Sequence, residues 1–147
     1  MAKQAGTLEL NSPYCYNLIA THFNQSSVHD NNPIGFLSGY FLPGAPHELF
    51  VWQIGLLPQY QGHGLAKHMI LSLLNRESCK KVTTLKATIS PSNAASLSLF
   101  KKIAKETQSL LTITPYFSSE DFPVAHEEEP LITIGPFNQY KNQEVSL

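Results

Sequence analysis

The sequence predicts an α/β or α+β fold, in which helices cover the faces of a sheet. Short apolar runs, rich in β-branched and aromatic residues and bounded by turn residues, predict strands over 34–42, 49–57, 85–89, 110–117 and 131–134. Apolar spacing typical of helices runs from Leu65 to Leu74 and again from Leu97 to Ala104. A chain of 147 residues has room for one domain, over 1–147, with a single core.

The N-terminal part of the chain predicts one further helix. Asn11-Ser12-Pro13 offers a polar cap followed by proline at the first helical position, and the helix is expected to run to about Phe23. Asp30-Asn31-Asn32-Pro33 then predicts a turn. The expected order of elements is therefore helix, strand, strand, helix, strand, helix, strand, strand.

Composition argues against several classes of function. Ten basic and eleven acidic residues give a formal charge of −1, whereas proteins that bind nucleic acid normally carry a basic patch. No apolar run approaches the roughly 18 residues that span a bilayer, and residues 1–7 lack the hydrophobic stretch of a signal peptide. Cys15 and Cys79 have no metal or redox spacing, which suits a reducing cytoplasm. We expect a soluble cytoplasmic protein that binds neither nucleic acid nor membrane.

The loop between the strand over 49–57 and the helix that begins at Leu65 is the most informative segment. It contains Gly62 and Gly64, and glycine lets the backbone approach a phosphate closely. The free N–H groups and the dipole at a helix start attract the same anion. Two glycines alone also fit a plain strand–turn–helix connection. The spacing is neither a dinucleotide fingerprint nor a P-loop.

Gln61, Gly64 and Ala66 resemble the acetyl-CoA motif of the GNAT superfamily, Gln/Arg-x-x-Gly-x-Gly/Ala. The resemblance implies that the backbone of this loop holds the pyrophosphate of acetyl-CoA, and that the end of the preceding strand binds the pantetheine arm. The residues so implicated are Gln61, Gly62, His63, Gly64, Leu65 and Ala66 in the loop and Ile54, Gly55 and Leu56 in the strand.

A second segment, from Asn93 to Phe100, resembles the helix that follows the fifth strand of that family. The resemblance implies that Asn93 contacts the cofactor arm and that Phe100 faces the thioester sulfur. Asn93 is also explained as an N-cap, and the two roles are compatible. Many members of the family carry a tyrosine acid where Phe100 stands, so the proton for the leaving thiolate must come from elsewhere.

The resemblance also implies the GNAT fold, a mixed, mostly antiparallel central sheet flanked by helices. The resemblance covers the chain from Thr7 to Phe137, and its segment Leu8–Tyr14 stands almost at the start, so we expect the first strand of that sheet to be missing or truncated. The sheet edge near Ile34–Leu42 would then be unpaired, which favours association. The family is usually dimeric, so we expect a homodimer that covers this edge.

Residues 8–16, 49–53 and 126–137 are similar to the 2,4-diaminobutyrate acetyltransferases of ectoine biosynthesis. This resemblance implies acetylation of the side-chain (N4) amine of a small diamine, whose ammonium groups need carboxylates. The implied substrate-binding residues are Glu9, Asn11, Tyr14, Trp52 and Glu129. The family usually has aspartate in place of Glu9, and Trp52 without the resemblance would be expected in the core.

By the same resemblance, Glu129 is the expected general base and His126, which orients the pocket, is its rival. Proline restricts the residue before it to extended backbone, so Pro130 is expected to hold Glu129 in place. Glu127 and Glu128 are expected to be solvated surface charges. Taken singly, an acid or a histidine in this loop would be a surface residue. The His-x-x-Glu spacing also suggests a metal, but no further ligands fall at metal spacing and no metal is expected.

Two alternatives to this function stay open. A GNAT enzyme for another small amine, such as lysine, ornithine or a polyamine, would keep the cofactor site and change the acceptor pocket. A degenerate GNAT domain would bind CoA without turnover, which the short N-terminus favours.

Overall fold

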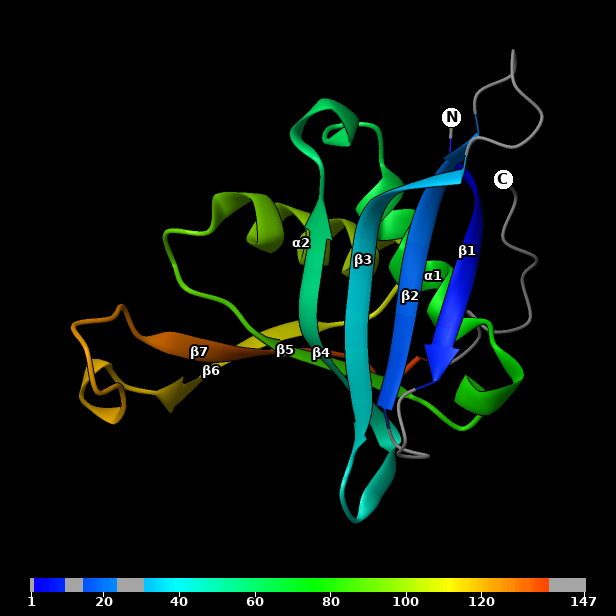
Figure 1. Cartoon of the computed structure of the whole chain (residues 1–147). Helices are drawn as coiled ribbons and strands as arrows, with labels where there is room; N and C mark the ends of the chain where they lie inside the picture. Colours follow the sequence, from blue (N-terminus) through cyan, green and yellow to red (C-terminus); the bar gives the residue numbers. More distant parts are fainter. Residues whose placement is uncertain (1, 10–14, 24–30, 138–147) are drawn as a thin grey trace.

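A computed structural model describes residues 2–9, 15–23 and 31–137, which form one seven-stranded sheet and two α-helices (Figure 1). The strands are β1 (Ala2–Glu9), β2 (Cys15–Phe23), β3 (Asn31–Leu42), β4 (Ala45–Leu56), β5 (Thr84–Thr88), β6 (Leu111–Phe117) and β7 (Glu129–Ile134). The helices are α1 (Leu65–Leu74) and α2 (Ala94–Glu106), with short 3-10 helices at Pro58–Tyr60, Glu77–Cys79 and Ser119–Asp121. None of the described helices is long and apolar enough to cross a membrane.

The strands lie in the order β1-β2-β3-β4-β5-β7-β6, and β4 and β5 are the one parallel pair within it. The sheet is therefore mixed and mostly antiparallel, as the sequence predicts. The strands and helices expected between residues 34 and 134 are confirmed, with boundaries that differ by a few residues.

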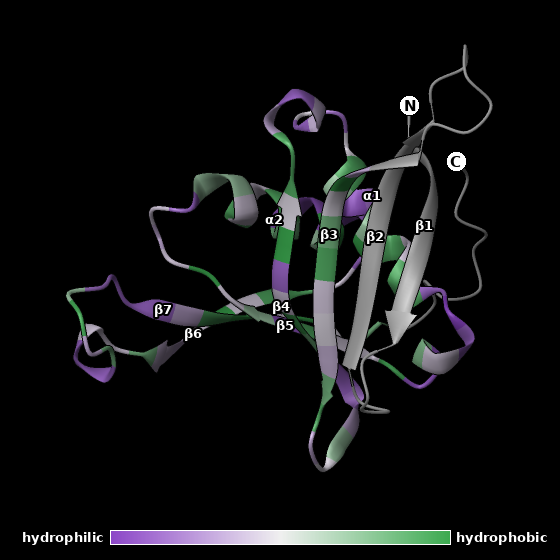
Figure 2. Cartoon of the chain, in the orientation of Figure 1, coloured by the Kyte–Doolittle hydropathy of each residue, from purple (hydrophilic) through white to green (hydrophobic). Residues whose placement is uncertain are grey.

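The core lies between one face of the sheet and the two helices, which lie behind the strands in Figure 1. Alternate strand residues point into it, among them Leu49, Leu85 and Ile132, all fully buried. Ile70 and Ile103 complete the contact from the helices. The period of two residues in a strand and 3.6 in a helix produces these apolar faces. In Figure 2 β5 and the later part of β7 are largely hydrophobic, whereas the start of β7 is hydrophilic.

The N-terminal part differs from the expectation. Residues 15–23, predicted as a helix, form strand β2, which pairs with β1 on one side and β3 on the other. Tyr16, Ile19 and Phe23 are of types that favour strands. Backbone pairing on both edges of β2 outweighs a local helix-start signal, because propensity is only a weak prior. That signal, at 11–13, lies outside the described residues.

The first strand is present and short, since β1 has eight residues whereas β3 and β4 have twelve each. The expectation of an unpaired sheet edge near Ile34–Leu42 is wrong, because β3 pairs with β2 on that side from Asn31 to Tyr40. The outer strands of the sheet are β1 and β6. Strand β3 therefore offers no free edge to a second copy of the chain.

Candidate functional site

The parallel pairing of β4 and β5 is short. Only Glu48–Phe50 of β4 pair with Thr84–Lys86 of β5, although β4 continues to Leu56 and β5 to Thr88. Beyond this point the strands separate, and Figure 1 shows β1–β4 running together while β5–β7 turn aside. We call this separation the fork. Within the described chain, β4 from Val51 onward has no partner strand on the β5 side, so an extended ligand can pair with its backbone.

A β-bulge at Trp52 lies at the fork. The β3–β4 register passes from Gly39 opposite Val51 to Ser38 opposite Gln53, and it leaves out Trp52. A bulge bends its strand and redirects a side chain. The Trp52 residue is 64% exposed. Its residue type alone would place it in the core, but the bulge turns it to the surface beside the fork.

An ion pair joins the two strands where the fork begins. Lys86 Nζ lies 2.7 Å from Glu48 Oε2, and the two side chains are 20% and 21% exposed. Partial burial weakens the screening by water and salt, so this pair is stronger than one on the open surface. Lys86 is the last residue of β5 that pairs with β4, and Glu48 is the first residue of β4 in the same stretch, so the ion pair holds the two strands together across their paired residues.

A cavity of about 720 Å³ lies beside the free end of β4. Its walls are the end of β4, the loop that leads into α1, and one face of α2. Every residue that the sequence implicates in cofactor binding lines this cavity, except His63 and Phe100. To these the structure adds Lys67, Ala95, Ser96, Ser98, Leu99 and Lys102.

The loop into α1 leaves backbone donors for an anion. Gly62 and Gly64 have φ angles of +78° and +76°, a region that residues with a Cβ rarely adopt. Gly64 is the N-cap of α1; no side chain caps this helix start, and the first turn contains no acidic residue. The first N–H groups of α1 therefore remain for a ligand at the positive end of the helix dipole. Gln61 Nε2 donates to Leu56 O at 3.2 Å and ties the loop to β4.

Asn93 caps a helix and also lines the cavity, so it occupies the place that the sequence predicts. It is the N-cap of α2, where its Oδ1 accepts a hydrogen bond from Ser96 N at 3.2 Å, and it also lines the cavity. The cap fixes the side chain at the start of α2. Its amide nitrogen is thereby held at the cavity wall.

Phe100 does not reach the cavity. It is 2% exposed and belongs to the core face of α2 with Ile103 and Ala104. Successive helix residues differ by about 100° around the axis, so Leu99 lines the cavity in its place. The motif predicted the position of the helix, but which of these two neighbouring residues faces the cavity depends on where the core lies.

His63 is the other predicted residue outside the cavity lining. Its side chain is exposed, with Nδ1 3.4 Å from Tyr60 O. The residues that the sequence reasoning missed include Ala95, Leu99 and Lys102, which recur at helical spacing on one face of α2. That periodicity, read together with Asn93, would have identified them.

The cavity has cationic character. Among the residues that the structure describes, Lys67 and Lys102 are the only charged ones that line it. Lys67 Nζ lies 3.4 Å from Glu106 Oε2, whereas Lys102 has no ion pair among the described residues. Together with the helix start, these ammonium groups suit a ligand that carries several phosphates.

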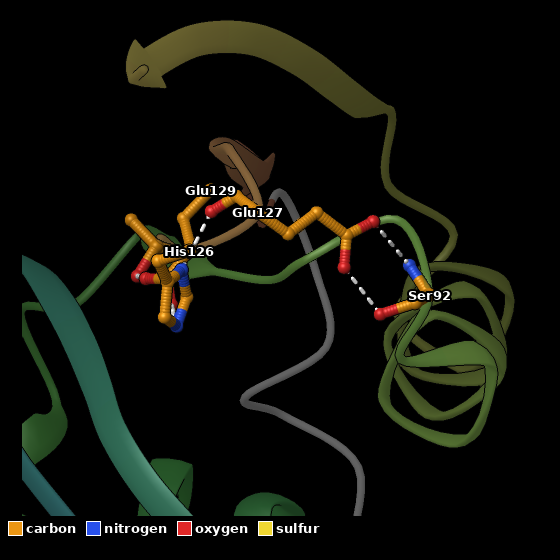
Figure 3. Close-up of polar contacts among 5 residues, drawn as sticks. Ser92, His126, Glu127 and Glu129 are labelled. Atoms are coloured by element: carbon orange, nitrogen blue, oxygen red, sulfur yellow. Dashed lines mark hydrogen bonds and ion pairs between the residues drawn. The ribbon is translucent and has the colours of Figure 1, made fainter. Parts of the chain in front are cut away.

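A carboxylate and an imidazole meet on the other side of the fork. Glu129, the first residue of β7, accepts a hydrogen bond through Oε2 from Thr88 Oγ1, at the end of β5, at 3.2 Å. Its Oε1 lies 3.6 Å from His126 Nε2, and the two side chains are 25% and 44% exposed. His126 stacks on Phe122, with ring centroids 4.2 Å apart. The structure thus brings together the predicted base and its rival (Figure 3).

Glu127 is exposed, as the sequence predicts, but its carboxylate also has a partner that the sequence does not reveal. Its carboxylate accepts hydrogen bonds from Ser92 N, at 3.0 Å, and from Ser92 Oγ. Figure 3 shows its side chain pointing away from His126 and Glu129, toward Ser92. Glu128 is exposed and has no hydrogen bond or ion pair within the described residues. The neighbouring acids of this cluster therefore differ in their surroundings.

The remaining predicted substrate residues lie in the N-terminal part. Asn11 and Tyr14 are outside the described residues. Glu9 is the last residue of β1, with its backbone opposite Tyr16 of β2. The described part of the site therefore contains Trp52, Glu129 and His126 on the acceptor side.

This arrangement can bring an anionic donor to an amine. The cavity and the helix start suit phosphates, the free edge of β4 is available to pair with an extended arm, and the Glu129–His126 pair can hold an ammonium and accept its proton. The chemistry that these features support best is acyl transfer to a small cationic acceptor.

Comparison with known proteins agrees with this chemistry. The acetyltransferase (GNAT) family model matches residues 9–104. The L-2,4-diaminobutyric acid acetyltransferase of Virgibacillus pantothenticus is 38% identical over 144 residues, which cover 95% of this chain and 91% of the relative. The protein of the same name from Halomonas elongata is 36% identical over 141 residues, which cover 93% of this chain and 73% of the relative.

Solved structures share the fold. The diaminobutyrate acetyltransferase EctA from Paenibacillus lautus, in complex with its substrate L-2,4-diaminobutyric acid and coenzyme A, is 33% identical with a TM-score of 0.75. The match covers 95% of this chain and 84% of that chain. Nourseothricin acetyltransferase is 16% identical with a TM-score of 0.62, over 86% of this chain and 67% of the other. At that identity the likeness concerns the fold alone.

Replacing Gly64 tests the cavity as the site for acetyl-CoA, the ligand that the sequence predicts. In Gly64→Val a β-branched residue must adopt a φ of +76°, so we expect the loop to distort and the affinity for acetyl-CoA to fall at least tenfold, or about 1.4 kcal/mol. Isothermal titration measures the affinity. Gly44→Val is the matched control, because Gly44 has a φ of +75° and, like Gly64, open space around a Cβ, but lies in the β3–β4 turn.

Both variants should lose a similar amount of stability, about 1–3 kcal/mol, because the backbone strain is of the same kind. Only Gly64→Val should lose affinity. Undiminished binding in a folded Gly64→Val protein would remove the cofactor assignment.

Proposed function

This chain belongs to the acetyltransferase (GNAT) family, and on that premise we propose that it transfers the acetyl group of acetyl-CoA to the side-chain (N4) amine of L-2,4-diaminobutyrate. The product is N4-acetyl-2,4-diaminobutyrate. The observation that carries the proposal is the partly buried carboxylate of Glu129, bonded to Thr88 at the free end of β5 and adjacent to His126. An ammonium group bound there lies across the fork from the strand that would hold the thioester.

The donor would occupy the cavity and the fork. The loop over 61–66 and the start of α1 would bind the pyrophosphate, and Lys102 supplies an additional cation without an ion pair in the described chain. The pantetheine arm would pair with the backbone of Ile54–Leu56, with Asn93 on its other side. Pairing of this kind needs backbone groups that no strand already uses, and the fork provides them.

The acceptor would bind at the opposite side of the fork. Its two ammonium groups require carboxylates, and Glu129 with Glu9 would provide them, while Trp52 and His126 shape the pocket. We also assign Asn11 and Tyr14 to this pocket, from their place in the segment that resembles diaminobutyrate acetyltransferases. The name shared by the relatives at 36–38% identity supports this choice of acceptor over other small amines.

The reaction would proceed within a complex of both substrates. The ammonium of the acceptor, whose pKa is about 10 when free, loses its proton to Glu129 directly or through water, with His126 beside it. The amine then attacks the acetyl carbonyl, and N–H groups of Ile54–Leu56 stabilise the oxyanion. The C–N bond forms, the C–S bond breaks, and the thiolate takes up the second proton of the attacking nitrogen. One proton is released overall.

We further propose that the enzyme acts in the cytoplasm, where acetyl-CoA is available, and that it serves ectoine biosynthesis under osmotic stress. The support is the resemblance to the diaminobutyrate acetyltransferases. An N4-acetylated diaminobutyrate is the product that such a route requires. Deletion of the gene should abolish ectoine accumulation in salt-stressed cells, and unchanged accumulation would refute this assignment.

We also propose a homodimer whose interface is formed by β6, because β3 is already paired on both sides. Strand β6 is an outer strand of the sheet, and its region carries exposed apolar side chains: Leu110, Ile113, Tyr116 and Phe117. Exposed apolar side chains at a free strand edge favour association. Light scattering at micromolar concentration should give twice the mass of the chain, and a mass of one chain would contradict this proposal.

A panel of acceptors tests the proposed activity. We expect thiol release from acetyl-CoA to be fastest with 2,4-diaminobutyrate, and slower with lysine, ornithine and spermidine, because the relatives at 36–38% identity carry the name of a diaminobutyrate acetyltransferase. NMR of the product should place the acetyl group on N4. Acetylation at the α-nitrogen, or faster turnover of a longer amine, would contradict the assignment of substrate. Binding of acetyl-CoA without thiol release for any amine would favour the degenerate alternative.

The charge of Glu129 is expected to be essential for the rate. Glu129→Gln keeps the size of the side chain and removes its charge, so kcat should fall about 10²–10⁴-fold, the usual effect of losing a general base. Glu128→Gln is the control, because Glu128 is exposed, and its effect should stay below about threefold. Steady-state kinetics measures both. Equal behaviour of the two variants would move the base to His126 or Glu9.

A further inference from the structure

We propose that Glu127 is a positioning residue that links the wall of the cofactor cavity to the proton-accepting pair Glu129–His126. This inference rests on the function proposed above for that pair. Glu127 makes contacts in two directions, since its carboxylate binds Ser92 and its main-chain carbonyl binds His126 (Figure 3). The sequence alone makes it one of a run of interchangeable acids.

The carboxylate contact anchors the segment before β7 to the start of α2. Both hydrogen-bond donors of Ser92, its N–H and its hydroxyl, bind the two oxygens of the Glu127 carboxylate. Hydrogen bonds to an ionised acceptor are roughly twice as strong as those between neutral groups. Ser92 precedes Asn93, the N-cap of α2, so the negative charge also lies close to the positive end of the helix dipole.

The main-chain contact determines which nitrogen of His126 carries hydrogen. Glu127 O lies 2.6 Å from His126 Nδ1. A carbonyl oxygen only accepts, so the hydrogen is on Nδ1. The other ring nitrogen, Nε2, faces Glu129 Oε1 at 3.6 Å. In its neutral form, His126 therefore turns a lone pair toward the carboxylate of Glu129.

Two acceptors that face each other offer two adjacent places for one proton. The proton that the substrate ammonium gives up can be taken by Glu129 Oε1 or by His126 Nε2, which lie 3.6 Å apart, while Thr88 Oγ1 donates to the other oxygen of Glu129. The ring of His126 is fixed on its face by Phe122, at 4.2 Å and 28° between planes. Glu127 O fixes the rotation of the ring about that stack, so Nε2 stays directed at Glu129.

The two contacts of Glu127 connect sites that belong to different substrates. Ser92 adjoins Asn93, which lines the cofactor cavity, and His126 adjoins Glu129 on the acceptor side. If the contact between Glu127 and Ser92 is lost, the start of α2 still has its cap, the hydrogen bond from Ser96 N to Asn93 Oδ1. The segment that carries the Glu127 carbonyl is then less fixed, and so is the ring of His126. The loss should therefore reduce the rate of the chemical step and leave the affinity for acetyl-CoA nearly unchanged.

The experiment compares Glu127→Gln and Ser92→Ala with Glu128→Gln in the full chain, each alone and combined with His126→Ala. Glu127→Gln weakens the carboxylate contact, Ser92→Ala removes its hydroxyl donor, and Glu128→Gln changes the neighbouring acid that has no such contact. We expect Glu127→Gln and Ser92→Ala to lower kcat about tenfold, the scale of a small misplacement of a catalytic group. The KM for acetyl-CoA should change less than about twofold, and Ser92→Thr should restore kcat. In the His126→Ala background, Glu127→Gln should have no further effect, because the two act as a unit.

A rate for Glu127→Gln equal to that of Glu128→Gln would overturn the proposal, and so would an undiminished effect of Glu127→Gln in the His126→Ala background. Nitrogen NMR of His126 provides a readout that needs no turnover. It should show hydrogen on Nδ1 in the unmodified protein and a mixture of tautomers in Ser92→Ala. Hydrogen on Nε2 in the unmodified protein would refute the positioning role, even if no amine is acetylated. Absence of turnover with the expected tautomer would instead refute the proposed activity and leave the positioning role intact.

Discussion

Parallel pairing between β4 and β5 stops after Phe50 and Lys86, and the rest of the site depends on that early end. Had the two strands stayed paired to Leu56, the backbone N–H and C=O groups of β4 would be hydrogen-bonded to β5, and no extended arm could pair with them. The bulge at Trp52 lies just beyond the last paired residue of β4 and bends the strand where β4 and β5 part. The ion pair from Lys86 to Glu48 holds the two strands together before that point. Because β7 pairs with β5, Glu129 at the start of β7 lies with the strands that turn aside, beside the end of β5.

The fork separates two kinds of electrostatic environment. On one side, the start of α1 with Lys67 and Lys102 forms a positive surface around the cavity. On the other side, Glu129 forms a negative one with His126 beside it. In the proposed reaction, a donor with phosphates and an acceptor with ammonium groups would be drawn to opposite sides of the fork, where their reacting ends would meet. Contacts that join the two sides, such as that of Glu127 with Ser92, then matter for alignment more than for affinity.

Sequence reasoning succeeded where the cause of a structure is local. The loop at Gly62 and Gly64 and the cap at Asn93 depend on a few neighbouring residues, and each lies where the sequence predicted. The strand over 15–23 was missed because its partners on one side, 31–40, lie further along the chain. Phe100 faces the core and not the cavity, because its direction is set by the strands that α2 packs against and not by its own segment. The contact of Glu127 joins residues 35 positions apart, and no local pattern shows it.

Hydrogen exchange of the backbone amides on addition of acetyl-CoA tests the central claim most directly, because it reports pairing along β4 and needs no acceptor. If the fork holds the extended arm of the donor, exchange should slow at the amides of 54–56 that face β5, together with those of the loop over 62–66. Protection limited to the loop, with the end of β4 exchanging as fast as before, would show that the donor binds by its phosphates alone and would contradict the account.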